Sequence, residues 1–566
     1  MSSPSFLPTT RVEMEDLGWD TIDVLLVTGD AYVDHPAFGT ALLGRWLVSQ
    51  GWRVGIVAQP RWDRTDDIMR LGRPRLFAGA SAGSLDSMLA HYTAFRKKRS
   101  DDAYTPGGAS GARPNRASIV YAGLLKRAFP GLPVVLGGIE ASLRRAAHYD
   151  FWSDSLRRSI LLDSKADLLV YGMGERAVLD ITRRLAHSED AHKLRGIPGT
   201  AFMGGPADIP AGAACVRLPS CEAIKGDPKR LLEATLALEG QMRSGSWALQ
   251  VHADRAVIFT LPAEPLDATE LDRLYALPFT RLAHPSYQEA IPAVEMLRAS
   301  VTAHRGCAGG CSFCSLALHQ GRRISSRSRD SIVAEVSALA RQPDWDGSIT
   351  DVGGPSANMW GARCAANPKV CRRASCLTPA ICPDFQDDQA GLVELLRALR
   401  ELAKVKHVRV ASGVRHDLAL RSPAYTRALT AEFTGGQLKL APEHASDEVL
   451  ALMRKPAFAV FERFLTLFEK ESRAAGKEQY VVPYLMSAFP GCTDAHMRAL
   501  ASWLKARGWK PRQAQCFIPV PGTVATAMFY AGIDLEGRRI KVARTDAERI
   551  RQHRILTEGW GRPEKG

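Results

Sequence analysis

The sequence predicts an α/β protein in which an N-terminal open parallel sheet precedes a partial six-stranded β/α barrel. Short apolar strand patterns alternate with helical patterns in the first 204 residues, and a second such series begins near residue 291. Cysteines and glycines gather where strands of both series end. The 566 residues, 46% hydrophobic and 24% charged, are typical of a folded chain with more than one core.

The N-terminal domain is expected over residues 21–204, after a tail of residues 1–20. A strand, a helix and a second strand form one βαβ unit, and two further strands run into glycines. These glycines, at 137, 138, 172 and 174, either approach a cofactor or only turn the chain. Residues 97–116 are polar and are expected to form an exposed loop. The strands are expected at 23–30, 52–60, 133–138 and 167–172, and the helix at 36–50.

The barrel is expected over residues 291–535, after a less periodic connecting subregion at 205–290 and before a basic C-terminal tail at 536–566. Strand and helix patterns alternate along it, as in a β/α barrel. The strand candidates are 297–304, 347–354, 407–413, 436–444, 479–487 and 512–520. The helices between them are expected at 331–339, 392–404, 424–433, 447–453 with 461–472, and 494–507.

Three cysteines follow the first barrel strand at once. Cys307, Cys311 and Cys314 have the spacing C-x3-C-x2-C in a glycine-rich stretch. Three thiolates on one short loop suit an iron-sulfur cluster with one iron left open for another ligand. A structural zinc site that borrows a distant fourth ligand is the alternative.

The triplet resembles the signature of the radical S-adenosylmethionine (radical SAM) superfamily, whose members have a partial β/α barrel. The resemblance implies that the three cysteines bind a 4Fe-4S cluster and that S-adenosylmethionine (SAM) chelates the open iron. Reduction then cleaves SAM and starts radical chemistry on a substrate. The resemblance further implies that Phe313 packs near the adenine and that Gly353 and Gly354, in DVGG, meet the SAM amino group.

Longer stretches, among them HRGCAGGCSFCSLALHQGR, GGPSANMWG and LAPEH, resemble the YgiQ family of radical SAM proteins over most of the chain. That family supplies no substrate and no catalytic residue to carry over. The N-terminal sheet resembles the cobalamin-binding domains that precede some radical SAM barrels. Asp34, His35 and Gly39 do not reproduce the D-x-H-x-x-G element that binds cobalt through histidine, so cobalamin is disfavoured but stays open.

A second cysteine group lies in a Cys-rich insertion at residues 364–382. It has gaps of six, four and five residues, wider than the tight pairs usual in zinc sites. A second metal site, either an iron-sulfur cluster or zinc, and ordinary reduced thiols are the alternatives. Its members are Cys364, Cys371, Cys376 and Cys382.

Several polar side chains near strand ends invite a functional interpretation. His444 beside Glu443 could act as an acid or base, or be a hydrogen-bonded structural histidine. The arginines could meet an anionic ligand, or form a solvated face, which we favour. The other histidines are His304, His319 and His416, and the arginines are Arg322, Arg323, Arg327 and Arg329.

Charge and targeting signals constrain the partners. The net charge of +14 allows an anionic partner such as nucleic acid. The sequence has neither a secretory signal nor a run of about 18 apolar residues, so we expect a cytoplasmic protein without membrane contact.

Radical SAM chemistry implies an electron donor such as a flavodoxin or ferredoxin. One alternative function is an RNA-modifying methylthiotransferase or methyltransferase, prompted by PGT at 521–523 and by the charge. Another is a zinc-bound nucleic-acid-binding or scaffold protein without catalysis.

Overall fold

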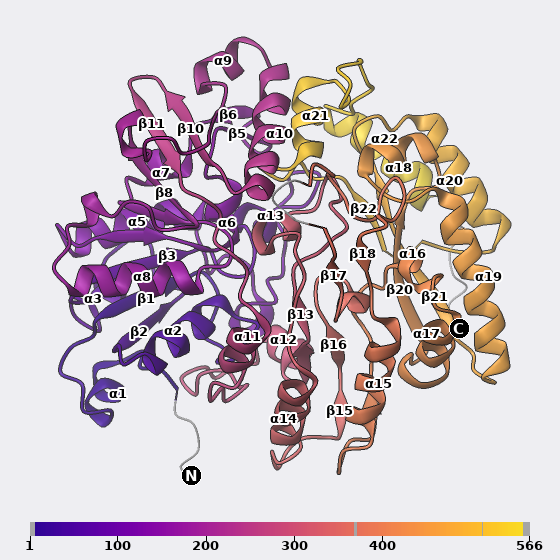
Figure 1. Ribbon diagram of the computed structural model, residues 1–566, viewed down its shortest axis with the longest axis horizontal. Coiled ribbons are helices and arrows are strands. Elements are labelled where there is room, and N and C mark those ends of the chain that lie inside the picture. Colours follow the sequence, from indigo (N-terminus) through magenta and orange to yellow (C-terminus); the bar gives the residue numbers. More distant parts are fainter. Residues whose placement is uncertain (1–5, 367–370, 512, 559–566) are drawn as a thin grey trace. The chain divides into compact units, whose positions relative to one another are not determined.

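The computed structural model describes residues 6–366, 371–511 and 513–558 in two compact units (Figure 1). The first unit holds the chain to Arg298 together with Leu318–Gln320, and the second holds Ala299–Ala317 and the chain from Gly321 onward. Parts of four predictions lie outside the described residues. They are residues 1–5 of the tail, 367–370 of the Cys-rich insertion, 512 of the sixth strand candidate and 559–566 of the basic tail.

The first unit is built on a nine-stranded sheet with the order β2-β1-β3-β4-β7-β8-β11-β10-β9. The first five strands of that order are parallel, and the order 2-1-3-4-5 is the doubly wound arrangement of flavodoxin-like folds. The α/β class and the predicted N-terminal parallel strands are therefore confirmed. The strands are β1 (Val24–Thr28), β2 (Val54–Ala58), β3 (Phe77–Ser81), β4 (Val134–Leu136), β7 (Leu168–Val170), β8 (Thr200–Gly204), β9 (Cys215–Arg217), β10 (Trp247–His252) and β11 (Arg255–Phe259), with a separate hairpin of β5 (His148–Asp150) and β6 (Ser155–Arg157).

The sequence analysis missed β3, which lies between β1 and β4. Its sequence, FAGAS, has small residues of low strand propensity and no apolar alternation. Close packing explains the small residues, because a Cβ on Gly79 would lie 3.0 Å from Leu26 Cδ2 of the next strand. Residues 205–290, expected only to connect, supply β9, β10 and β11, and the strand pairs β7–β8, β8–β11 and β10–β11 are antiparallel.

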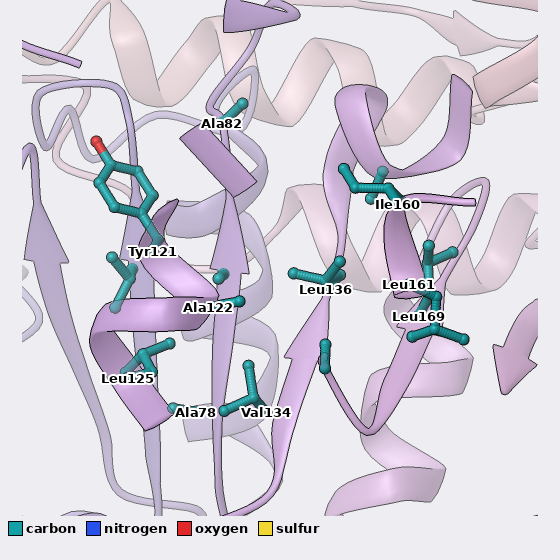
Figure 2. Packing of buried hydrophobic residues seen from close by; sticks show 14 of the residues in the cluster. Ala78, Ala82, Tyr121, Ala122, Leu125, Val134, Leu136, Ile160, Leu161 and Leu169 are labelled. Carbon is teal, nitrogen blue, oxygen red and sulfur yellow. The ribbon is translucent and has the colours of Figure 1, made fainter. Parts of the chain in front are cut away.

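Two large apolar clusters form the core of the first unit. One packs α5 (Ala117–Ala128) against the sheet through Tyr121, Ala122 and Leu125 (Figure 2). The other packs residues of α2 (Gly39–Ser49) and α8 (Glu175–Ala186) against the sheet. The remaining helices are α1 (Arg11–Asp16), α3 (Asp66–Met69), α4 (Ser87–His91), α6 (Gly138–Leu143), α7 (Ile160–Ser164), α9 (Cys221–Gly226), α10 (Lys229–Ser244), α11 (Ala268–Tyr275) and α12 (Pro292–Leu297).

The second unit contains six parallel strand segments in sequence order, which is the predicted partial barrel. β12 pairs with β16, β15 with β19, β20 with β21, and β21 with β22, all in parallel. A parallel bridge between Val414 and Leu440 joins the third segment to the fourth. The strands are β12 (Ser300–Thr302), β15 (Ser348–Ile349), β16 (Asp351–Gly353), β19 (His407–Val408), β20 (Gln437–Glu443), β21 (Tyr480–Ser487) and β22 (Gln513–Cys516).

Helices separate the barrel strands at the predicted places, and two short hairpins carry the loops of the site. The expected helix at 424–433 is a helix followed by a π-helical turn at Leu429–Phe433. The hairpins pair β13 (His304–Arg305) with β14 (Ser325–Ser326) and β17 (Arg363–Cys364) with β18 (Phe385–Gln386). The helices are α13 (Leu316–Gln320), α14 (Arg329–Leu339), α15 (Gln389–Arg400), α16 (His416–Ala419), α17 (Pro423–Ala428), α18 (Asp447–Met453), α19 (Phe458–Ala474), α20 (Asp494–Ala506), α21 (Val524–Ala531) and α22 (Asp546–Thr557), the last within the expected basic tail.

Candidate functional site

The cysteine triplet lies on a loop that follows β12 and β13, beyond the carboxyl end of the first barrel strand. Two glycines fix its path. Gly306 has φ +83°, and a Cβ there would collide with the backbone oxygen of Arg323. Gly310 has φ +61°, and a Cβ there would collide with the backbone oxygen of Ala374. Both the left-handed backbone and the close approach therefore require glycine.

The three cysteines are half-buried, and their thiols lie close to one another. Burial raises the pKa of Cys307, and it raises the pKa of Cys314 to about 12, with neighbouring cysteine thiols adding to both effects. Both shifts favour the neutral thiols of Cys307 and Cys314 in the metal-free protein, whereas a bound metal deprotonates its thiol ligands. The donor set therefore fits an iron-sulfur cluster.

A third glycine leaves room beside the sulfurs. A Cβ on Gly309 would lie 3.4 Å from Cys307 Sγ, 3.8 Å from Cys311 Sγ and 3.3 Å from Arg415 Nη1. Any larger residue would fill the space next to two candidate ligands. The loop thus keeps open the space that a metal centre between the sulfurs needs.

A buried arginine lies next to the triplet. Arg415 Nη1 is 3.9 Å from Cys311 Sγ, while Arg415 Nε donates to Asp417 Oδ1 at 2.9 Å and Arg415 Nη2 to Asp417 Oδ2 at 2.5 Å. The arginine lowers the pKa of Asp417 to about 2 although burial opposes it. Asn358 Oδ1 accepts from the Arg415 backbone N–H at 2.8 Å, which fixes the residue further.

The sequence analysis missed Arg415 and Asp417. They lie in SGVRHD, directly after the third strand, and charged residues at the carboxyl end of a barrel strand are the signal that could have found them.

Two other barrel segments hold the triplet loop. The Ser312 backbone N–H donates to Met453 O at 3.0 Å, and Ser312 Oγ donates to Leu452 O at 2.7 Å at the end of α18. The Ala525 backbone N–H, in the first turn of α21, donates to Ser312 O at 2.9 Å. The PGT segment at 521–523 therefore leads into a helix that contacts the cysteine loop, with Thr523 as its N-cap.

Gly353 and Gly354 end the second barrel strand, where the resemblance expects a SAM contact. A Cβ on Gly354 would lie 2.5 Å from His304 O and 2.7 Å from His304 Nε2. A Cβ on Gly353 would lie 3.3 Å from Ala357 Cα. Packing thus supplies one reason for Gly354, and the SAM contact stays a prediction.

Phe313 is half-buried, and its ring contacts Phe489 edge-on with the centroids 6.2 Å apart. Phe489 in turn contacts Phe517 at 5.3 Å. Phe313 therefore begins an aromatic series inside the barrel unit, and its predicted contact with adenine stays a prediction.

The structure brings the four cysteines of the second group together. Burial raises the pKa of Cys376, the Arg322 guanidinium lowers it, and the thiols of Cys364, Cys371 and Cys382 raise it further. Of the four, Cys364 is exposed. Among the described residues, no three His, Cys, Asp or Glu side chains are gathered tightly enough to hold one metal ion.

The histidines near strand ends have structural surroundings. His444 Nδ1 accepts from the backbone N–H groups of Ala445 and Ser446, both at 2.9 Å, so the ring proton is on Nε2, 3.5 Å from Cys492 Sγ. Glu443 pairs with Lys455 at 3.7 Å, so it does not orient His444. The acid-base hypothesis for His444 is therefore not supported.

His416 and His319 are held by other contacts. His416 packs edge-on against Phe461, and burial lowers its pKa to about 3. His319 Nδ1 lies 3.0 Å from Ser142 Oγ, with both residues in the first unit. Burial lowers the pKa of His304 to about 4.

The arginines divide into two kinds. Arg323 and Arg329 are exposed, as expected. Arg327 is buried and pairs with Glu335, so its assignment to a solvated face is wrong. Its Nη1 also donates to Thr302 O at 3.0 Å, which ties the segment before α14 to the first barrel strand.

The carboxyl edge between β1 and β3 is the topological switch point where flavodoxin-like sheets bind ligands. Here the buried Arg113 forms ion pairs with Asp30 at 3.1 Å and with Asp102 at 2.8 Å. The 97–116 loop, expected to be exposed, therefore buries both Asp102 and Arg113. The backbone at Gly29 lies so close to Ala82 O that a Cβ on Gly29 would collide with it. The segments that follow β1 and β3 are therefore in direct contact.

Arg113 thus pairs with side chains of its own unit at this edge, and cobalamin binding stays open, as the sequence left it. His35 is buried, with Nε2 3.0 Å from Arg281 Nη1, and Asp34 is paired with Arg45 at 2.5 Å.

Comparisons with known proteins agree with this architecture. A family model described as Radical SAM N-terminal matches residues 6–300. A UPF0313 protein of Geobacter sulfurreducens is 51% identical over 98% of this chain and 92% of its own length. UPF0313 protein YgiQ of Salmonella typhimurium is 44% identical over 97% of this chain and 85% of its own length.

Solved structures show the same fold. The radical S-adenosylmethionine methyltransferase TsrM from Kitasatospora setae, with tryptophan substrate and a SAM analog bound, aligns with a TM-score of 0.50 at 14% identity. The alignment covers 92% of this chain and 85% of that one. Another structure of TsrM holds cobalamin and a [4Fe-4S] cluster. No helix among the residues described for this chain is long and apolar enough to cross a bilayer.

Proposed function

This chain belongs to the UPF0313 family of radical SAM proteins, which includes YgiQ, and on that premise we propose that it is an enzyme that cleaves SAM reductively. Cys307, Cys311 and Cys314 would hold a 4Fe-4S cluster. Such a cluster, reduced by an electron donor such as a flavodoxin or ferredoxin, supplies the electron that cleaves SAM to methionine and a 5'-deoxyadenosyl radical. The substrate of that radical is not assigned.

The observation that carries the proposal is the crowding of three half-buried thiols on a loop whose path requires glycine at positions 306 and 310. Three ligands leave one coordination position open, as in catalytic metal sites. Gly353 and Gly354 end the neighbouring strand, where a small backbone lets a ligand approach. Phe313 offers an aromatic face next to the last cysteine.

The residues around the triplet have roles that follow from their contacts. Arg415 places a positive charge 3.9 Å from Cys311 Sγ, where it would balance the negative charge of a bound cluster and its thiolates. Asp417 holds the guanidinium with two hydrogen bonds and balances its charge. Neither side chain is assigned contact with the substrate, so we regard both as positioning residues.

The test is anaerobic reconstitution with iron and sulfide, followed by reduction with dithionite in the presence of SAM and an assay for 5'-deoxyadenosine. We expect product from the wild type and from Cys215→Ala, a thiol of the first unit, and none from Cys311→Ala. A wild type that binds no iron, or a Cys311→Ala variant that forms as much product, would overturn the proposal.

The alternatives find less support. Likeness to a methyltransferase at 14% identity concerns the fold alone, so methyl transfer and methylthiolation are not proposed. The net charge of +14 is the observation in favour of a nucleic-acid substrate, and charge also describes many basic enzymes. At the switch point Arg113 pairs with Asp30 and Asp102 of its own unit, and no step through cobalamin is proposed.

A further inference from the structure

The second cysteine group, Cys364, Cys371, Cys376 and Cys382, is gathered by a hairpin. Cys364 ends β17 and lies opposite Phe385 of β18 in the antiparallel register. The Phe385 backbone N–H donates to Cys382 O at 3.0 Å, and the Cys382 backbone N–H donates to Cys376 O at 2.7 Å. The hairpin thus brings Cys364 and Cys382 near each other, and a backbone hydrogen bond links Cys382 to Cys376.

Hydrogen bonds organise the loop that carries these thiols. Ser375 Oγ accepts from the backbone N–H groups of Leu377 and Thr378, both at 3.0 Å. Arg373 donates through Nε to Ser375 O at 3.1 Å and through Nη2 to Ala380 O at 2.6 Å. The loop conformation that gathers the thiols is therefore specified by the protein itself.

An arginine with one unsatisfied hydrogen-bond donor lies beside the four cysteines. Arg322 Nη2 is 3.8 Å from Cys376 Sγ, and Arg322 Nη1 donates to Arg373 O at 2.8 Å. Arg322 Nε is buried and has no hydrogen-bond partner among the described residues. A buried donor without an acceptor is costly, and an anionic group bound by the thiols would supply one.

The second group also lies against the triplet loop. The Cys376 backbone N–H donates to Ala308 O at 3.1 Å, and Ser375 Oγ donates to Gly309 O at 2.6 Å. Cys307, Cys376 and Cys382 all pack against one small apolar cluster. The loops that carry the two cysteine groups are thus in direct contact.

The spacing of the thiols favours a cluster over a single ion. Four thiolates around one zinc, each about 2.3 Å from the metal, lie roughly 3.8 Å apart, and the described side chains form no such tight set. In an iron-sulfur cluster each thiolate binds a different iron, so the sulfurs are farther apart. The three thiols of the triplet likewise form no set tight enough for a single ion among the described side chains.

We infer that Cys364, Cys371, Cys376 and Cys382 bind a second 4Fe-4S cluster, next to the one proposed at the triplet. Four thiolates complete the coordination of all four irons, so this cluster has no open position for SAM. The four thiol protons leave to solvent or buffer as the ligands bind. The inference goes beyond the proposed function, because this site can load whether or not the triplet cleaves SAM.

The test is the iron and sulfide content of the full-length protein after anaerobic reconstitution, together with EPR spectra of the reduced protein. We expect about eight irons and eight sulfides per chain in the wild type, and about four of each in Cys371→Ala/Cys376→Ala. A triplet variant, Cys307→Ala/Cys311→Ala/Cys314→Ala, should also keep about four. Its EPR signal should not change when SAM is added.

Two further variants guard against misfolding. Cys364→Ser alters an exposed side chain, so it should fold and still lower the iron content, whereas Cys215→Ala should retain the full content. About four irons in the wild type and none in the triplet variant would overturn the inference. One zinc per chain that is lost in Cys376→Ala would also overturn it, in favour of a zinc site. If instead the triplet variant keeps all eight irons, the proposed function fails and the second site is unaffected.

Discussion

Replacing Asp417 by asparagine should destabilise the barrel unit, because the change removes the charge that compensates the buried Arg415. The fall in the pKa of Asp417 from 3.8 to about 2 corresponds to about 2 kcal/mol in favour of the carboxylate. Breaking a buried ion pair by changing one partner typically costs about 3–5 kcal/mol. Asparagine can still accept one hydrogen bond, so we expect a loss of about 2–4 kcal/mol at pH 7.

The assay is urea unfolding of the reconstituted wild type and variant, with circular dichroism as the signal that monitors unfolding. Glu558→Gln is the control, because its pair with Arg554 is exposed and worth at most about 0.5 kcal/mol. If Asp417→Asn loses no more stability than the control, the Asp417 charge does not compensate Arg415 as proposed.

The pH dependence provides an independent check. The pKa of Asp417 is lower in the folded protein than in the unfolded chain, so its stabilisation is complete above about pH 4 and disappears as the pH falls toward 2. Between pH 5 and pH 3 the difference between wild type and Asp417→Asn should shrink by about 1 kcal/mol. A difference that stays constant over this range would show that the carboxylate charge is not responsible.

Three other substitutions follow from the same contacts. Gly310→Ala should lower the free energy of unfolding by more than about 2 kcal/mol and lower the bound iron, because φ is +61° and the new Cβ would collide with Ala374 O. Gly508→Ala is the control: its φ is +66° in open space, so it should cost about 1 kcal/mol and retain the iron. Ser375→Ala should cost about 2–3 kcal/mol in urea unfolding, because two backbone N–H groups lose their acceptor. Burial lowers the pKa of His416 from 6.5 to about 3, so between pH 7 and pH 5 only the unfolded chain gains this proton and the wild type loses stability. His416→Phe should lose about 2 kcal/mol less than the wild type over this range. The same loss in both proteins would contradict this.

The arginines after the triplet show where sequence reasoning stops. Arg327 and Arg329 are two positions apart in one basic stretch, yet the first is buried against Glu335 and the second is exposed. The residues that bury Arg327 come from another strand and from the following helix. The local sequence does not reveal these contacts, because the buried and the exposed arginine lie in the same basic stretch.

Local patterns in the sequence were enough to predict the class of fold, the six barrel strands and the close set of Cys307, Cys311 and Cys314. Strand and helix periods are local, and ligands three or four residues apart stay close in any compact loop. The N-terminal sheet was only partly predictable, because β3 consists of small residues whose strand is stabilised by neighbours on both sides.

The surroundings of the triplet depend on contacts between segments that are far apart in the sequence. Arg415 reaches Cys311 across 104 residues of sequence, and the second cysteine group lies against Ala308 through hydrogen bonds that no spacing rule contains. Such contacts arise when parallel strands place their carboxyl ends along one edge, which brings distant loops together. Periodicity specifies each strand, whereas the order of the strands in space specifies which side chains meet.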